Sequence, residues 1–138
     1  IEPNSYSNLI NLLEQITIKT NNDLFISSGN INNKFTEKFR DDFSVTQTNI
    51  YKLKTKKIFF LNNLTINQLE FAITKCSTLI SCHGAPTHIA AAFNKKIIDI
   101  IDISEKNFFN KWSAHFRQCK QLQRLEFSKL SKDILSHL

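Results

Sequence analysis

Apolar residues recur at helical spacing near the start of the sequence. In YSNLINLLEQI, residues 6–16, leucine and isoleucine repeat three or four positions apart, which predicts an amphipathic helix. The polar letters TNND end that pattern, and LFISSGN then predicts a short buried strand ending at Gly29. Phenylalanines four positions apart in NNKFTEKFRDDF, residues 32–43, predict a second helix that buries one face.

Further along, short apolar runs alternate with amphipathic segments. The predicted elements are a strand in 56–63, a helix in 64–76, a strand in 77–81, a helix in 87–93, a strand in 95–102 and a closing helix in 127–138. Residues 104–124 are aromatic and basic, and their pattern does not divide them into elements. Apolar strands between helices are typical of a parallel sheet covered on both faces. The pattern therefore predicts one α/β domain over residues 1–138, with a Rossmann-like parallel sheet.

Composition and charge narrow the class of protein. A hydrophobic fraction of 41% and twelve Phe in 138 residues indicate a folded domain rather than a disordered chain. The formal net charge of +6 favours anionic partners, such as nucleotide phosphates or an acidic membrane surface. Three cysteines without a CxxC pair, and no apolar run of membrane-spanning length, predict a cytoplasmic protein with reduced thiols. Because the chain starts at Ile1 and contains no Met, we expect it to be part of a longer protein.

The turn SCHGAPTH, residues 81–88, concentrates residues that are scarce elsewhere. It holds one of the two glycines, one of the two prolines and two of the four histidines. In open α/β sheets, ligands bind beyond the carboxyl ends of the strands, and the first N–H groups of a helix suit a phosphate. Gly84 allows close backbone approach, Pro86 suits a first helical turn and Thr87 offers a hydroxyl. The turn therefore predicts an anion site, although ordinary connecting structure would also explain it.

The segment NNLTINQLEFAITKCSTLISCHGAPTHIAAAFNKKIIDII resembles the C-terminal half of ADP-heptose-type glycosyltransferases, glycosyltransferase family 9. The family pattern is a capped helix, an apolar strand, then Asp-Ser/Thr-Gly-x-x-His leading into an Ala-rich helix. His88 falls on the family histidine and Thr87 on the residue before it. His83 stands where the family has Asp, Gly84 where it has Ser or Thr, and Ala85 where it has Gly.

The resemblance implies the C-terminal domain of a GT-B fold, whose turn holds the diphosphate of a nucleotide-sugar donor. It further implies a bacterial transferase of lipopolysaccharide or other surface glycan synthesis, cytoplasmic or peripheral at the inner membrane. The acceptor site and catalytic base would lie on a missing N-terminal domain, so this domain alone would not complete a transfer. No metal or other cofactor is implied. The predicted donor-binding residues are Ser81, His83, Gly84, Ala85, Pro86, Thr87, His88, Lys111 and Arg117.

Other chemistries stay open at this point. A zinc site could draw on Cys82, His83, His88, His115 and Cys119, although these come from separated segments without a close pair. A cysteine hydrolase could use Cys82 or Cys76 with His83 or His88, but adjacent residues on a strand end point to opposite sides. The segment 106–124 could bind a partner or nucleic acid in a non-catalytic module. It lacks a known nucleic-acid-binding signature, so no nucleic acid is expected.

Overall fold

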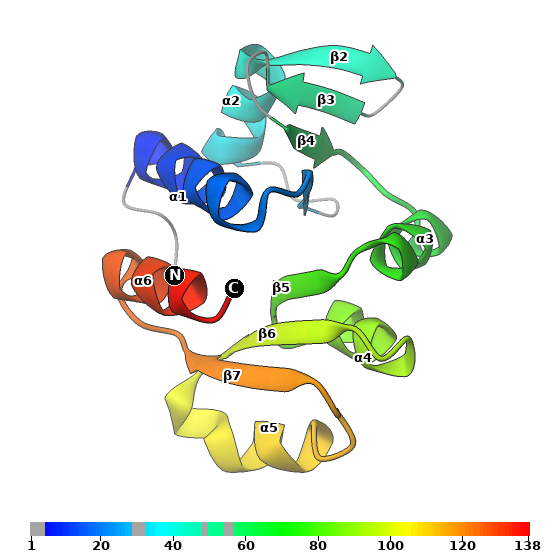
Figure 1. Ribbon diagram of the computed structural model, residues 1–138, viewed down its shortest axis with the longest axis vertical. Helices are drawn as coiled ribbons and strands as arrows, with labels where there is room; N and C mark the ends of the chain where they lie inside the picture. Colours follow the sequence, from blue (N-terminus) through cyan, green and yellow to red (C-terminus); the bar gives the residue numbers. More distant parts are fainter. Residues whose placement is uncertain (1–4, 29–32, 48–49, 54–56) are drawn as a thin grey trace. The chain divides into compact units, whose positions relative to one another are not determined.

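The computed structural model describes residues 5–28, 33–47, 50–53 and 57–138. They form an α/β protein whose chain divides into two compact units, residues 2–65 and residues 66–137. We call these the N-terminal unit and the C-terminal unit. Each has its own sheet, a four-stranded mixed one and a three-stranded parallel one respectively (Figure 1). Within the described residues, no helix combines the length and the apolar content needed to cross a membrane.

The N-terminal unit packs two helices with the mixed sheet. Its elements are α1 (Tyr6–Thr20), β1 (Leu24–Ser27), α2 (Lys34–Asp42), β2 (Phe43–Gln47), β3 (Ile50–Leu53) and β4 (Ile58–Leu61). The strand order is β1-β4-β3-β2, with β1 parallel to β4 and the other pairs antiparallel. The side chain of Ser5 accepts a hydrogen bond from the N–H of Asn8 at 3.2 Å and begins α1, and Asn21 ends it in a left-handed conformation.

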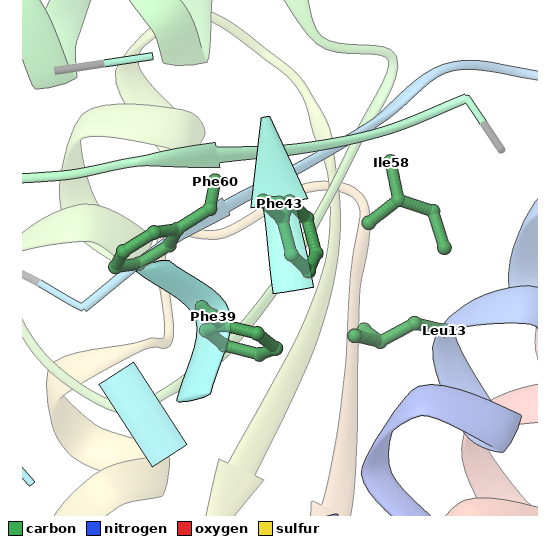
Figure 2. Packing of buried hydrophobic residues seen from close by; sticks show 5 residues of the cluster. All are labelled: Leu13, Phe39, Phe43, Ile58 and Phe60. Carbon is green, nitrogen blue, oxygen red and sulfur yellow. The ribbon is translucent and has the colours of Figure 1, made fainter. Parts of the chain in front are cut away.

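The core of this unit is a cluster of apolar side chains from both helices and the sheet. Leu13 of α1 meets Phe39 of α2, Phe43 of β2, and Ile58 and Phe60 of β4 (Figure 2). The ring centroids of Phe39 and Phe60 are 5.1 Å apart, and those of Phe39 and Phe43 are 5.2 Å apart in an edge-on arrangement. Ile58 and Phe60 are completely buried, so this cluster carries much of the unit's stability.

The C-terminal unit is built around three parallel strands in the order β5-β6-β7 (Figure 1). Its elements are α3 (Ile66–Lys75), β5 (Thr78–Cys82), α4 (Ala85–Ala92), β6 (Lys96–Ile101), a 3-10 turn η1 (Ile103–Glu105), α5 (Lys106–Trp112), β7 (Cys119–Gln123) and α6 (Phe127–Ser136). Helices α3 and α4 contribute Ile73 and Ala90 to a core cluster with Ile97 of β6. The central strand β6 is therefore buried along most of its length.

The α/β class is confirmed, but the strands lie in two sheets rather than in the one parallel sheet that the pattern predicts. The N-terminal sheet is also mixed rather than parallel, because β3 pairs antiparallel with β4 and β2 pairs antiparallel with β3. Most residues of β2 are exposed and polar, so its sequence lacks the apolar run that marks a buried strand. Gly29, the predicted end of β1, lies outside the described residues. The single-domain organisation stays a prediction.

Candidate functional site

The turn between β5 and α4 lies at the carboxyl edge of the parallel sheet. Because β5, β6 and β7 are parallel, their carboxyl ends share one edge. His83 comes directly after β5, and its N–H donates a hydrogen bond to the carbonyl of Ile100 at 3.2 Å. This bond extends the pairing with β6 by one residue and fixes the backbone from which the turn departs.

The start of α4 is capped by bonds within the turn itself. The hydroxyl of Thr87 donates to the carbonyl of Gly84 at 2.7 Å and accepts from the Gly84 N–H at 3.3 Å. The N–H groups of Thr87 and His88 also donate to the Gly84 carbonyl, at 3.0 and 3.4 Å. Pro86 has no N–H to offer. Because Thr87 is completely buried, its hydroxyl and these amides stabilise the helix start instead of facing solvent.

Neither backbone conformation nor packing requires a glycine at position 84. Its φ of 165° lies in the extended region that any residue adopts. A Cβ placed there would come no closer than 3.9 Å to its nearest neighbour, Pro86 Cδ. The missing side chain therefore leaves room beside the backbone that the fold itself does not use.

The imidazole of His83 is held by a buried carboxylate. Its Nδ1 lies 2.8 Å from Oδ2 of Asp99, which is in the middle of β6 and completely buried. An ionised carboxylate only accepts hydrogen bonds, so Nδ1 carries the proton in this pair and Nε2 is the nitrogen left for another partner. The second oxygen of Asp99, Oδ1, has no hydrogen-bond partner within the described part of the chain. Burial of a carboxylate is costly unless its oxygens are hydrogen-bonded, so the bond to His83 is important for keeping Asp99 inside the sheet.

Two further imidazoles and several aromatic rings surround His83. The ring centroid of His88 lies 5.3 Å from that of His83 and 5.8 Å from that of His115. The ring centroid of Phe116 lies 5.0 Å from that of His88 and 4.7 Å from that of His115. The ring centroid of Phe109 lies 4.8 Å from that of His83. We call His83, His88 and His115, with Phe109 and Phe116, the imidazole cluster. It joins the turn to the segment between β6 and β7.

The cluster predicts a loss of stability in mild acid. Burial lowers the pKa of His88 below its usual 6.5, the charges of His83 and His115 lower it further, and Asp99 opposes them. The unfolded chain therefore takes up a proton at His88 at a higher pH than the folded chain does, so the free energy of unfolding falls as the pH drops below about 6.5. We expect His88→Gln to flatten this fall between pH 7 and 5, measured by urea unfolding followed through Trp112 fluorescence. Parallel curves for the two proteins would contradict the prediction.

The remaining predicted donor-binding residues are placed differently. Ser81, on β5, donates its hydroxyl to the carbonyl of Cys82 at 2.8 Å, and Ala85 is exposed at the start of α4. Lys111, in α5, and Arg117, before β7, are exposed; within the described residues neither makes a hydrogen bond or an ion pair with the turn. The structure thus brings His83, Gly84, Thr87 and His88 together without the two cations.

Sequence reasoning missed Asp99 and the two phenylalanines of the imidazole cluster. A signal for Asp99 is present, because an acidic residue inside the apolar run KIIDII must find a partner if the strand is buried. Asp99 pairs in register with Ser81, which places its side chain on the same side as that of His83, two residues after Ser81 and just beyond the end of β5. Phe109 and Phe116 carry no comparable signal, since their segment has no clear periodicity.

The three cysteines are free thiols with different accessibility, which predicts selective alkylation. Cys82 is exposed at the end of β5. Burial raises the pKa of the half-buried Cys76, and burial with the charge of Asp99 raises that of Cys119 to about 11. Because the thiolate is the reactive form, we expect iodoacetamide at pH 8 to modify Cys82 at least about tenfold faster than the others. Mass spectrometry of timed digests measures this, and equal rates at the three sites would contradict it.

Among the described residues, no three side chains of His, Cys, Asp or Glu gather closely enough to hold a metal ion. The candidate site predicted from the sequence is the β5–α4 turn, and the structure adds to it the contact of His83 with Asp99. The chain matches no known protein-family model, no curated protein and no solved structure.

Proposed function

We propose that this chain is the donor-binding part of a glycosyltransferase and that it holds the diphosphate of a nucleotide sugar at the β5–α4 turn. The observation that carries the proposal is Gly84. It stands at the carboxyl edge of a parallel sheet, where ligands of such sheets bind, and the fold itself does not require a glycine there. A residue without a side chain at this place suits close approach of a ligand to the backbone.

Imidazoles supply the chemistry at this turn. Since the amides of Gly84, Thr87 and His88 are engaged within the helix cap, the side chains of this turn best suited to a phosphate are the imidazoles of His83 and His88. Nδ1 of His83 is bonded to Asp99, so its Nε2 can donate to a phosphate oxygen when the ring is protonated. Positive charge on the His83 ring, which lies beside the Asp99 carboxylate, would stabilise the leaving nucleoside diphosphate as the sugar departs.

Other parts of the proposal follow from the family resemblance. A separate domain would bind the acceptor and supply the catalytic base, and the product would belong to lipopolysaccharide or another surface glycan. Lys111 and Arg117 are exposed cations of the same unit, and a bound donor could draw either side chain toward its phosphates. No step of this scheme needs a metal ion.

The proposal is tested by ligand titration followed by amide NMR. ADP-, UDP- and GDP-sugars, with inorganic pyrophosphate, should shift the amide signals of residues 83–88. Gly84→Ala should weaken binding at least about tenfold while leaving the thermal unfolding temperature nearly unchanged, because the added Cβ would meet its neighbours in the free protein only at ordinary van der Waals distance, 3.9 Å from Pro86 Cδ and 4.0 Å from the Cys82 carbonyl oxygen. Ala92→Ser, at the exposed far end of α4, is the control and should bind normally. Absence of shifts with every ligand, or unchanged binding by Gly84→Ala, would overturn the proposal.

A further inference from the structure

Helix α5 exposes two large aromatic side chains to solvent. Phe108 and Trp112 are each 55% exposed, and their ring centroids are 5.8 Å apart. Residues four positions apart lie on the same face of a helix, so the two rings form one surface, which we call the aromatic pair. Two neighbouring exposed rings are costly in water and indicate a surface that a ligand covers.

The aromatic pair adjoins the β5–α4 turn through direct ring contacts. The centroid of Trp112 lies 6.3 Å from that of His88. The ring centroids of Phe108 and Phe109 are 5.6 Å apart, and those of Phe109 and His83 are 4.8 Å apart. One ligand could therefore touch an imidazole of the turn at one end and the exposed rings at the other.

An open hollow with both polar and apolar lining lies beside Phe108. It has a volume of about 420 Å³ and is lined by Ser104, Glu105, Asn107 and Phe108. These residues follow β6 directly, so the hollow is formed by the segment that leaves the ligand-binding edge of the sheet. A hydroxyl, a carboxylate and an amide offer both donors and acceptors next to a flat apolar ring. That combination suits a heteroaromatic ring with polar edges.

We propose that the aromatic pair stacks the nucleobase of the bound nucleotide and that the hollow receives the polar edge of that base. This inference rests on the proposed function, because the phosphates would lie at the turn. Stacking on aromatic side chains accepts any nucleobase, so selection among bases would come from Glu105 and Asn107. The exposed Lys106 and Lys111 of the same helix would favour the anionic ligand over an uncharged aromatic compound.

The single tryptophan makes this inference directly testable. The indole N–H of Trp112 gives one NMR signal, and a base stacked on the ring should shift it. Adenosine, cytidine and uridine, which lack phosphate, test the aromatic pair, and inorganic pyrophosphate tests the turn. We expect the nucleosides to shift the Trp112 signal in a saturable manner, with pyrophosphate shifting the amides of residues 83–88 instead.

A matched pair of variants separates stacking from general hydrophobic binding. Phe108→Ala should weaken nucleoside binding at least about fivefold. Phe71→Ala removes a ring that is 64% exposed on α3 of the same unit and should leave nucleoside binding unchanged. Asn107→Ala should alter the ratio of affinities among the three nucleosides.

The outcomes distinguish the two proposals. Pyrophosphate shifts at the turn without any nucleoside effect on Trp112 would overturn the nucleobase site and leave the donor-binding proposal standing. Equal nucleoside binding by the Phe108→Ala and Phe71→Ala proteins would also overturn it. The absence of every shift would overturn both proposals.

Discussion

Replacing Asp99 with alanine is expected to lower the free energy of unfolding of the C-terminal unit by about 1–3 kcal/mol and to release the His83 ring. The carboxylate is completely buried and is the acceptor for the Nδ1 proton of His83. Without it, that N–H loses its acceptor in a half-buried site, which costs about the desolvation of one polar group. Urea unfolding measures the stability, and nitrogen NMR of the imidazole shows which ring nitrogen carries the proton.

Two further variants interpret this result. Asp99→Asn keeps an oxygen that can accept from Nδ1 and should retain most of the stability and the fixed tautomer. Asp102→Asn changes an exposed aspartate three residues later, whose oxygen accepts from the N–H of Ser104, and should leave His83 unaffected. An Asp99→Ala protein as stable as wild type, with an unchanged His83 spectrum, would show that the pair does not position the ring. If the donor-binding proposal holds, Asp99→Ala should also weaken pyrophosphate binding.

Replacing Phe60 with alanine is expected to destabilise the N-terminal unit by about 3–5 kcal/mol, the usual cost of removing a buried phenylalanine ring. Phe60 is completely buried, and its ring lies 5.1 Å from Phe39 and 6.0 Å from Tyr51. Both tyrosines of the chain, Tyr6 and Tyr51, pack against this cluster, so their ring NMR signals report on the N-terminal unit. Urea unfolding followed through those signals gives the change in stability.

The control for this prediction is Phe25→Ala on the neighbouring strand β1. Phe25 is 55% exposed, and the one ring it stacks on among the described residues is Phe59, with the ring centroids 5.1 Å apart, so its loss should cost less than about 1 kcal/mol. Equal destabilisation by the two substitutions would mean that the buried cluster does not dominate the stability of the unit. An unfolding midpoint of the Phe60→Ala protein at the same urea concentration as that of the wild type would also contradict the prediction.

The local pattern of apolar and polar residues was sufficient to predict the helices that bury one face and the strands that are apolar along their length. The predicted helices correspond to α1, α2, α3, α4 and α6, and the predicted apolar strands to β1, β4, β5 and β6, with boundaries that differ by a few residues. Three strands could not be found in this way: β2, whose residues are mostly exposed and polar, and the strands β3 and β7. The sequence of β3, IYKL, is half-buried at every position, and that of β7, CKQLQ, buries only Leu122 completely. Neither has the run of apolar residues that marks a buried strand.

The candidate site depended on contacts that no local pattern encodes. The turn alone points to Gly84 and Thr87, because scarce residues gather there, whereas His88 follows from the family resemblance. The bond from His83 to Asp99 joins residues sixteen positions apart and exists only because β5 and β6 pair in parallel register. The internal cap by Thr87 likewise depends on the helix starting at Ala85, two residues earlier than the sequence pattern predicts. The local sequence was thus sufficient to predict the position of the turn. The contact between His83 and Asp99 could not be predicted from it, because that contact depends on which strands pair in the sheet.

The different strand orders of the two sheets have a consequence for how quickly each unit forms. In the C-terminal unit, strands that are consecutive in the chain are also neighbours in the sheet. In the N-terminal unit, β1 pairs with β4, and Leu24 lies opposite Ile58. The pair can form only after the chain between them, which contains α2, β2 and β3, brings the two strands together. Contacts between residues distant in the chain carry a larger loop-closure entropy and form more slowly. The Trp112 signal should therefore reach its native value before the tyrosine signals when the protein refolds from urea.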